Sequence, residues 1–312
     1  NNTVFQKENF EIELFEVRDQ KEGESRTSDL LVPLKFTGPN KDRTEYVNYY
    51  FDFETSTRRS DKTATIHKPY CVFTQKHRGG FFGEDCGKKL LDDILKQHGT
   101  SVDEAVDIDV DDPKSTPFVR LIAHNSSYDF RFILKYLVRV DTIEKGTGLM
   151  NCNARYYNYG KFIDIQIRDS LKMINMGLGK FGSCFGLDVK KEILPYDLYS
   201  EEAVQQKYLP VKYCLKYVKD EDQAEYLENC KKWNCMVNIL KYSGEYCYLD
   251  CIVLQQGYEK FGSLVEEAIG EDISNYISLA SMAHNHLVKE GCYDNVLQVS
   301  GVPRAFIQKC VV

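Results

Sequence analysis

Polar and hydrophobic residues alternate over short stretches in the first half of the chain, which predicts β-strands. Tyr46–Glu54 is rich in aromatic residues, and its polar positions recur at every second residue near its end. Phe118–Ala123 is a short apolar run of the kind that forms a buried strand. Strands are also predicted at His67–Gln75, Met150–Tyr159 and Phe162–Arg168.

Helical periodicity appears in several other segments. Gly87–His98 has apolar residues on one helical face, and so does Ser127–Val138. From Ser170 onward the pattern is mostly helical. Helices are predicted there at Asp222–Tyr242, Glu245–Phe261 and Ser278–Lys289, with Ser243-Gly244 separating the first two.

The order of these elements predicts an α/β domain over residues 45–262. Residues 1–44 are polar and mixed and form an N-terminal extension. Ser101–Pro117 is acidic and bounded by proline, which predicts a loop. Residues 263–312 are predicted to contain one helix and the start of a further unit.

Composition narrows the class of protein. The chain has 312 residues, of which 43% are hydrophobic and 28% are charged, as in ordinary globular proteins. Its eleven cysteines are scattered, which argues against a disulfide framework and favours an intracellular, reducing compartment. No apolar run reaches the ~18–20 residues of a membrane helix. The net charge of -7 does not favour nucleic acid, but carboxylates that hold metal ions would contribute to such a charge.

Two acidic residues end the first aromatic strand. Because side chains alternate along a strand, Asp52 and Glu54 are expected on one face and Phe51 and Phe53 on the other. Adjacent carboxylates repel each other, and a bound cation removes that cost. An acidic pair on a strand is more often a simple surface feature, so this motif alone predicts little.

Two further motifs combine an acid with polar or aromatic neighbours. Asn125, Tyr128 and Asp129 follow the predicted buried strand at the start of a helix, where Ser126 or Ser127 is a plausible N-cap. Tyr246 and Asp250 are four residues apart and would share one helical face. Capping and core packing are the ordinary explanations of each motif, but their occurrence together points to a shared site.

In this order, D-x-E, N-x-x-Y-D and Y-x-x-x-D resemble the motifs of the 3′–5′ exonucleases of the DEDD type, tyrosine variant, in the ribonuclease H-like superfamily. Ser170–Ile174 resembles the (S/T)-L-x-x-hydrophobic motif of protein-primed family B DNA polymerases. Lys191–Leu194 resembles the K-x-x-hydrophobic motif of that group, and Val299–Phe306 resembles the stretch before its polymerase palm. The later polymerase motifs of the family do not occur in this chain.

The resemblance implies a ribonuclease H-like mixed sheet flanked by helices, and the start of a polymerase palm region. It implies two divalent ions, Mg²⁺ or Mn²⁺, held by carboxylates, with Tyr246 orienting the attacking water and Lys191 stabilising phosphate charge. Lys190 stands beside Lys191, and the match does not decide which lysine acts. The predicted metal ligands are Asp52, Glu54, Asp129 and Asp250, and the predicted single-stranded DNA contacts are Asn125, Tyr128, Ser170 and Leu171.

The function implied is proofreading in a DNA-directed DNA polymerase, with DNA, a polymerase domain in cis and a terminal protein primer as partners. One alternative is a catalytically weak module that binds DNA or terminal protein. A weaker alternative is a stand-alone RNA-processing exonuclease. His124 is expected to have a core or capping role, because two-metal hydrolysis needs no histidine.

Overall fold

The structure, a computed structural model, describes residues 3–7, 10–14, 31–33, 46–59, 65–102, 118–145, 148–189, 192–294 and 297–299, and the single residues 304 and 307. It divides into two compact units. One comprises residues 1–38 and 284–312, and the other comprises residues 39–283. All the residues singled out above as site candidates belong to the second unit, which we call the main unit.

Short antiparallel pairs make up the strands described in the smaller unit. In the first pair, β1 (Thr3–Lys7) lies beside β2 (Phe10–Leu14). In the second, β3 (Leu31–Pro33) pairs with β14 (Leu297–Val299), so segments from opposite ends of the sequence meet there.

An eight-stranded mixed sheet organises the main unit. Its order is β6-β5-β4-β8-β11-β10-β9, and β7 pairs with β11 beside this path. β8 is parallel to both β4 and β11, whereas the outer pairs are antiparallel. The strands are β4 (Tyr46–Arg59), β5 (Thr65–Thr74), β6 (His77–Phe82), β7 (Thr100–Ser101), β8 (Phe118–Ala123), β9 (Leu137–Lys145), β10 (Gly148–Asn158) and β11 (Lys161–Asp169).

Helices and one small strand pair complete the described fold. The strand pair is β12 (Tyr208–Pro210) with β13 (Met236–Asn238). The α-helices are α2 (Cys86–His98), α3 (Phe130–Ile133), α4 (Phe181–Phe185), α5 (Glu201–Gln206), α6 (Val211–Cys214), α7 (Gln223–Cys230), α8 (Ile239–Ile269) and α9 (Leu279–Lys289).

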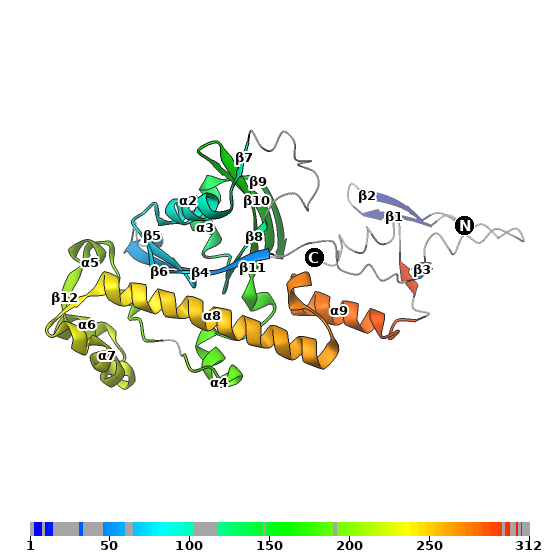
Figure 1. Cartoon of the computed structure of the whole chain (residues 1–312). Coiled ribbons are helices and arrows are strands. Elements are labelled where there is room, and N and C mark those ends of the chain that lie inside the picture. Colours follow the sequence, from blue (N-terminus) through cyan, green and yellow to red (C-terminus); the bar gives the residue numbers. More distant parts are fainter. Residues whose placement is uncertain are drawn as a thin grey trace, which may run out of the picture. The chain divides into compact units, whose positions relative to one another are not determined.

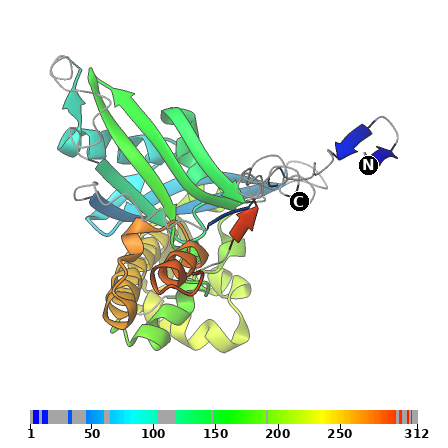
Figure 2. The ribbon, with the colours of Figure 1, turned by 90° about the vertical axis from the view of Figure 1, so that its right-hand side faces the viewer.

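Helices cover both faces of the sheet. α2 and α3 lie on one face and the long α8 lies along the other, as Figure 1 shows. The view in Figure 2, turned by 90°, again places the cyan helix α2 and the yellow-orange helix α8 on opposite sides of the strands. The predicted fold class, an α/β protein with a mixed sheet flanked by helices, is confirmed, and the strand order agrees with a ribonuclease H-like fold.

Three apolar clusters hold these layers together. The first joins β4 and the central strands to α2, with Phe51, Leu91 and Ile94 fully buried. The second packs β5 and α5–α7 against the first half of α8, and the third packs β4, β8 and α4 against its second half. α8 contributes buried apolar residues to two of the clusters. Their packing sets the rotation of the helix and therefore which of its polar residues face the sheet.

The predicted break at Ser243-Gly244 is wrong, because α8 continues through both residues. Ser243 is fully buried, and its hydroxyl donates to the carbonyl of Leu240 at 3.3 Å. A Cβ at Gly244 would lie 2.9 Å from Phe73 Cζ. The glycine therefore allows close packing of α8 against β5 and does not end a helix, since the packing outweighs its weak helix propensity.

The long helix predicted at Ser127–Val138 is also wrong. α3 covers only Phe130–Ile133, a 3₁₀ turn follows, and β9 already begins at Leu137. Leu137 pairs with Tyr156 of β10, so sheet pairing overrides the helical period. Neither serine serves as the N-cap, because Asp129 occupies that position and Ser127 Oγ accepts from the backbone N–H of Leu149 at 2.7 Å.

The predicted domain boundaries stay predictions. α8 extends beyond residue 262, the predicted end of the α/β domain. Most of the acidic loop predicted at Ser101–Pro117 and most of the palm-like stretch Val299–Phe306 lie outside the described residues. Across the described part of the chain, no helix combines the length and apolar character that a membrane crossing requires.

Candidate metal-binding active site

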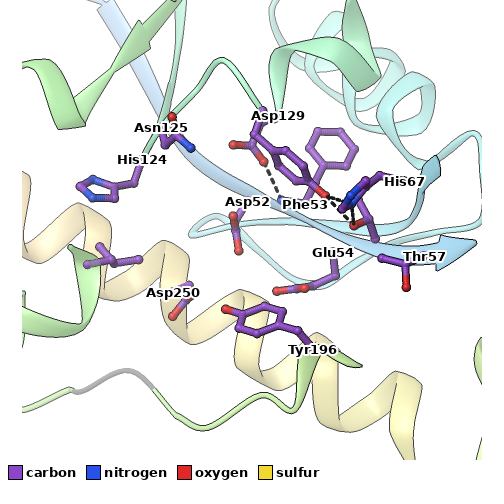
Figure 3. A pocket seen from close by; sticks show the side chains of 13 residues that line it. Asp52, Phe53, Glu54, Thr57, His67, His124, Asn125, Asp129, Tyr196 and Asp250 are labelled. Atoms are coloured by element: carbon purple, nitrogen blue, oxygen red, sulfur yellow. Dashed lines mark hydrogen bonds between the residues drawn. The ribbon is translucent and has the colours of Figure 1, made fainter. Parts of the chain in front are cut away.

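The alternation of β4 separates its acids from its aromatic residues, as predicted. Phe51 and Phe53 are buried in the cluster under α2. Asp52 and Glu54 point toward α8, where Glu54 is only 6% exposed and Asp52 is partly buried. The strand therefore presents two carboxylates to the layer that contains Asp250 (Figure 3).

α8 meets these acids across the sheet. The thiol of Cys247 donates to the main-chain oxygen of Asp52 at 3.2 Å, which ties the helix to the strand. Ligand atoms of Asp52, Glu54 and Cys247 lie within 4.8 Å of one another. Asp250 is one helical turn further along and is 2% exposed, so it faces the same region.

Asp129 reaches the site from the loop after β8. It is buried, and its Oδ1 accepts a hydrogen bond from the backbone N–H of Phe53 at 3.2 Å. This bond places a third segment of chain directly against β4. Asn125 lies in the same loop with φ of 67°, a left-handed conformation that asparagine adopts more readily than most residues.

A pocket of about 410 Å³ contains the convergence point. Figure 3 shows Asp52, Glu54, Asp129 and Asp250 around its inner part. The four predicted metal ligands are thus brought together from β4, the loop after β8, and α8. The described residues that line the pocket are Asp52, Phe53, Glu54, Thr55, Thr57, His67, His124, Asn125, Tyr128, Asp129, Leu178, Tyr196 and Asp250.

Negative charge is concentrated in this pocket. Burial first, then the neighbouring Cys247, and then the carboxylates of Asp129, Glu54 and Asp250 raise the pKa of Asp52 well above its usual range. Burial also raises the pKa of Asp129, against the opposing hydrogen bond from Phe53. Neither lysine nor arginine occurs among the described residues that line the pocket.

This donor set fits hard divalent cations. Mg²⁺ and Mn²⁺ prefer carboxylate oxygens, and four carboxylates offer enough of them for two ions that also retain water. A bound cation would also offset the burial and the carboxylate repulsion that together raise the pKa of Asp52. The sulfur of Cys247 is a softer donor, and it is already engaged with the main chain of β4.

Tyr246 is placed differently from its neighbours. It is 1% exposed, and its hydroxyl forms a 2.5 Å hydrogen bond with the hydroxyl of Tyr196. Tyr196 lines the pocket, whereas Tyr246 is not among the described lining residues. Burial first, and Asp250 second, raise the pKa of Tyr246, so its phenol stays protonated and can donate or accept a hydrogen bond.

The remaining predicted contacts have three different outcomes. Asn125 and Tyr128 line the pocket. Ser170 and Leu171 are not among the described lining residues, although Ser170 Oγ is 2.9 Å from Nδ1 of the pocket residue His124. Lys191 and its neighbour Lys190 lie outside the described residues.

Asp169 is a nearby carboxylate that the motifs did not indicate. Its Oδ1 accepts from the backbone N–H groups of Asn125 at 2.9 Å and Leu171 at 3.0 Å. It is buried, and these two hydrogen bonds hold the loop after β8 beside the turn that follows β11. The sequence places Asp169 directly after the predicted strand Phe162–Arg168, but its position opposite Ala123 follows from the parallel pairing of β11 with β8.

Other pocket residues were not predicted as site residues. His67 and Thr57 form a cross-strand pair of β5 and β4, and Tyr196 begins the short 3₁₀ helix Tyr196–Leu198 after Pro195. His124 was expected in a core or capping role. It lines the pocket, and its ring is hydrogen-bonded to the hydroxyl of Ser170.

A mixed sheet with helices on both faces, and four carboxylates converging at one pocket, define an α/β protein with a candidate divalent-metal centre. The chain belongs to the family DNA polymerase type B, organellar and viral, whose model matches residues 118–295, more than half of the sequence. The family predicted from the motifs is confirmed. The matched segment contains Asp129, Tyr246 and Asp250, whereas Asp52 and Glu54 precede it.

Individual relatives are distant. A protein described as a probable DNA polymerase, from Ascobolus immersus, is 24% identical over 172 residues, which are 53% of this chain and 14% of that protein. Phi29 DNA polymerase complexed with single-stranded DNA has a TM-score of 0.39 at 16% identity, over 73% of this chain and 32% of that chain. Its complex with primer-template DNA and incoming nucleotides has a TM-score of 0.35 at 17% identity, over 70% and 32%.

Proposed function

We propose that the chain is a 3′–5′ exonuclease region that removes nucleotides from the 3′ end of single-stranded DNA for proofreading. The observation that carries this proposal is the convergence of Asp52, Glu54, Asp129 and Asp250 in one pocket. Membership of a DNA polymerase family supports DNA as the substrate. The partners proposed are a primer-template, a polymerase domain in cis and a terminal protein primer.

The four carboxylates would hold two Mg²⁺ or Mn²⁺ ions, which supply Lewis-acid stabilisation of the attacking and leaving oxygens of a phosphodiester. Asp52 would contribute to holding these ions together with Glu54, since the two lie close together and the Cys247 contact holds the main chain of Asp52 near α8. Asp129 accepts a hydrogen bond from the backbone N–H of Phe53, which orients its carboxylate toward β4.

Hydrogen-bonding side chains complete the proposed mechanism. Tyr196 presents its phenol to the pocket, and Tyr246 holds that phenol from behind through the 2.5 Å contact. Because burial raises the pKa of Tyr246, the pair orients water by hydrogen bonding and does not act as a base. Lys191 is proposed to stabilise phosphate charge from outside the carboxylate cluster.

The substrate strand would enter past Asn125 and Tyr128. The Tyr128 ring offers a surface on which any base can stack, which suits an enzyme that must accept every sequence. Ser170 and Leu171 would contact the strand through the loop that Asp169 holds beside Asn125. Unpaired ends would be preferred, because a frayed terminus can reach the pocket without the cost of melting a duplex.

The decisive experiment follows the shortening of a 5′-labelled single-stranded DNA oligonucleotide with Mg²⁺ or Mn²⁺. Asp52→Ala/Glu54→Ala should lower the rate by about three orders of magnitude or more, since Lewis-acid stabilisation contributes several kcal/mol. Glu266→Ala/Glu267→Ala is the matched control, because it removes two adjacent exposed carboxylates from α8 and should retain the wild-type rate. Undiminished cleavage by the folded Asp52→Ala/Glu54→Ala protein would refute the proposal.

The same assay separates the alternatives. DNA binding without cleavage in either metal would indicate a binding module for DNA or terminal protein. Faster degradation of an RNA oligonucleotide than of its DNA counterpart would indicate an RNA-processing enzyme. A DNA duplex with a mismatched 3′ end should be shortened faster than its fully paired equivalent, as proofreading requires.

A further inference from the structure

The hydroxyl of Tyr128 is held by two side chains at the outer part of the pocket. It lies 2.6 Å from Thr55 Oγ1 and 2.9 Å from His67 Nδ1. Thr55 Oγ1 and His67 Nδ1 are themselves 3.4 Å apart, so the three groups form a closed network. Threonine, tyrosine and histidine come from β4, the loop after β8, and β5, so the network joins three segments at the pocket, where Figure 3 labels His67.

The ring of Tyr128 is fixed from both ends. At its inner side it meets Phe132 edge to face, with centroids 5.3 Å apart, and Phe132 packs in turn on Phe53. At its outer side the His67 ring meets it at 89°, with centroids 5.7 Å apart. Aromatic contacts of this geometry favour one orientation of the ring.

His67 has no evident part in folding. It is exposed, and it lies opposite Thr57 in the β4–β5 pairing. Both residues line the pocket, so they extend it beyond the carboxylates along the two strands. An exposed histidine that contributes little to the core but touches a pocket aromatic residue is suited to positioning that residue.

We propose that His67, with Thr55, positions the Tyr128 ring as a rigid stacking platform for an unpaired base of the substrate strand. His67 is thus a positioning residue, and the ligand class is a single-stranded nucleic acid with at least one base near its 3′ end. The inference rests on the proposed function for its substrate. A platform that is ordered before the substrate arrives binds more tightly, because less conformational freedom is lost on binding.

The first test is His67→Ala in the full chain, assayed on a short single-stranded DNA oligonucleotide. KM should rise about three- to tenfold with kcat within twofold, as expected from ordering one side chain on binding. Ile66→Ala is the matched control, because Ile66 is the exposed neighbour on the opposite face of β5 and should leave KM unchanged. His67→Asn should have a KM close to that of wild type, since the asparagine amide can replace Nδ1 of His67 in the hydrogen bond to Tyr128.

A double-mutant cycle identifies the partner. Tyr128→Phe keeps the ring but removes the hydroxyl, so it should raise KM by the same factor as His67→Ala. The double variant should be no worse than either single variant, because both remove one network. Effects that multiply in the double variant would overturn the proposal, and so would a His67→Ala KM within twofold of wild type.

A third measurement asks whether a base is what the platform holds. Oligonucleotides with abasic sites at the last two positions should bind wild type and His67→Ala equally well. If the His67→Ala defect persists on the abasic strand, His67 does not act through stacking and the proposal is wrong.

Failure of the proposed function would be distinguishable. If wild type binds single-stranded DNA without cleaving it, the same threefold to tenfold change is expected in Kd, measured by fluorescence anisotropy. That result would support the stacking role of Tyr128 and His67 although the nuclease proposal is wrong. A wild-type protein that neither binds nor cleaves the oligonucleotide would overturn both.

Discussion

The two faces of β4 show how one strand can serve two purposes. On the α2 face, Phe51 is fully buried among apolar side chains. On the α8 face, Asp52 and Glu54 lie beside Cys247, with Asp250 on the same helix. The first face is stabilised by burial of apolar side chains, whereas the second gathers like charges that a bound cation would stabilise.

Carboxylates on the two sides differ in the same way. Asp92 of α2 accepts hydrogen bonds from Lys88, Tyr156 and Asn158. Burial alone would raise its pKa, but these donors lower it below the usual value. Asp52 has acidic neighbours, and burial raises its pKa. The contrast teaches that partners, and not burial alone, separate a structural carboxylate from a candidate ligand.

The largest effect on stability is expected from the apolar face. Phe51→Ala should lower the free energy of unfolding by about 3–5 kcal/mol, because it removes a fully buried ring. Asp52→Asn, one residue away, should not destabilise the metal-free protein, since it removes a repelling charge. Urea unfolding of both variants without metal would measure this, and equal losses would contradict the division between the two faces.

The next effect concerns metal addition and removal. If the α8 face holds divalent cations, Mg²⁺ at about one hundred times its Kd should stabilise the folded protein by about 2.7 kcal/mol. EDTA should reverse the gain, and Asp52→Asn/Asp250→Asn should remove most of it. Thermal unfolding with and without Mg²⁺ tests this, with Glu266→Ala/Glu267→Ala as a charge-matched control. If Mg²⁺ stabilised Asp52→Asn/Asp250→Asn as much as wild type, the ions would bind elsewhere.

The smallest effect belongs to Asp92. Because its pKa is lowered in the folded state, its stabilisation is present above the unfolded pKa, near 4, and is lost as the pH falls through the lower folded value. Asp92→Asn should cost about 1 kcal/mol at pH 7, the usual scale of such hydrogen bonds. That difference should shrink below about pH 4. A constant difference from pH 7 to pH 3 would mean that charge is not the cause.

Local patterns predicted most of the central elements. β8 coincides with the predicted Phe118–Ala123, and α2 begins one residue before the predicted Gly87. The errors arose where a distant element decided the outcome. Residues after Ile133 enter β9 because β10 offers a partner, and Gly244 stays helical because Phe73 needs its space.

For the site, sequence motifs named the four carboxylates, Tyr246, Asn125 and Tyr128. They could not show that Tyr246 lies behind Tyr196, because the 2.5 Å contact joins a short 3₁₀ helix to α8, fifty residues apart in the chain. Nor could they indicate His67, which enters the pocket only because the β4–β5 register sets it opposite Thr57. The roles of all these residues in catalysis stay predictions.

The sequence by itself determined the alternation of β4, the positions of β8 and α2, and the family. These follow from side-chain periods and motifs that extend over a few residues. Only the tertiary structure decided that Asp250 and Asp52 line one pocket and that Asp169 accepts a hydrogen bond from Asn125. It also decided that the buried Tyr246 hydroxyl bonds to the Tyr196 hydroxyl at the pocket. Such contacts depend on how separate elements pack against one sheet, and no local period records that packing.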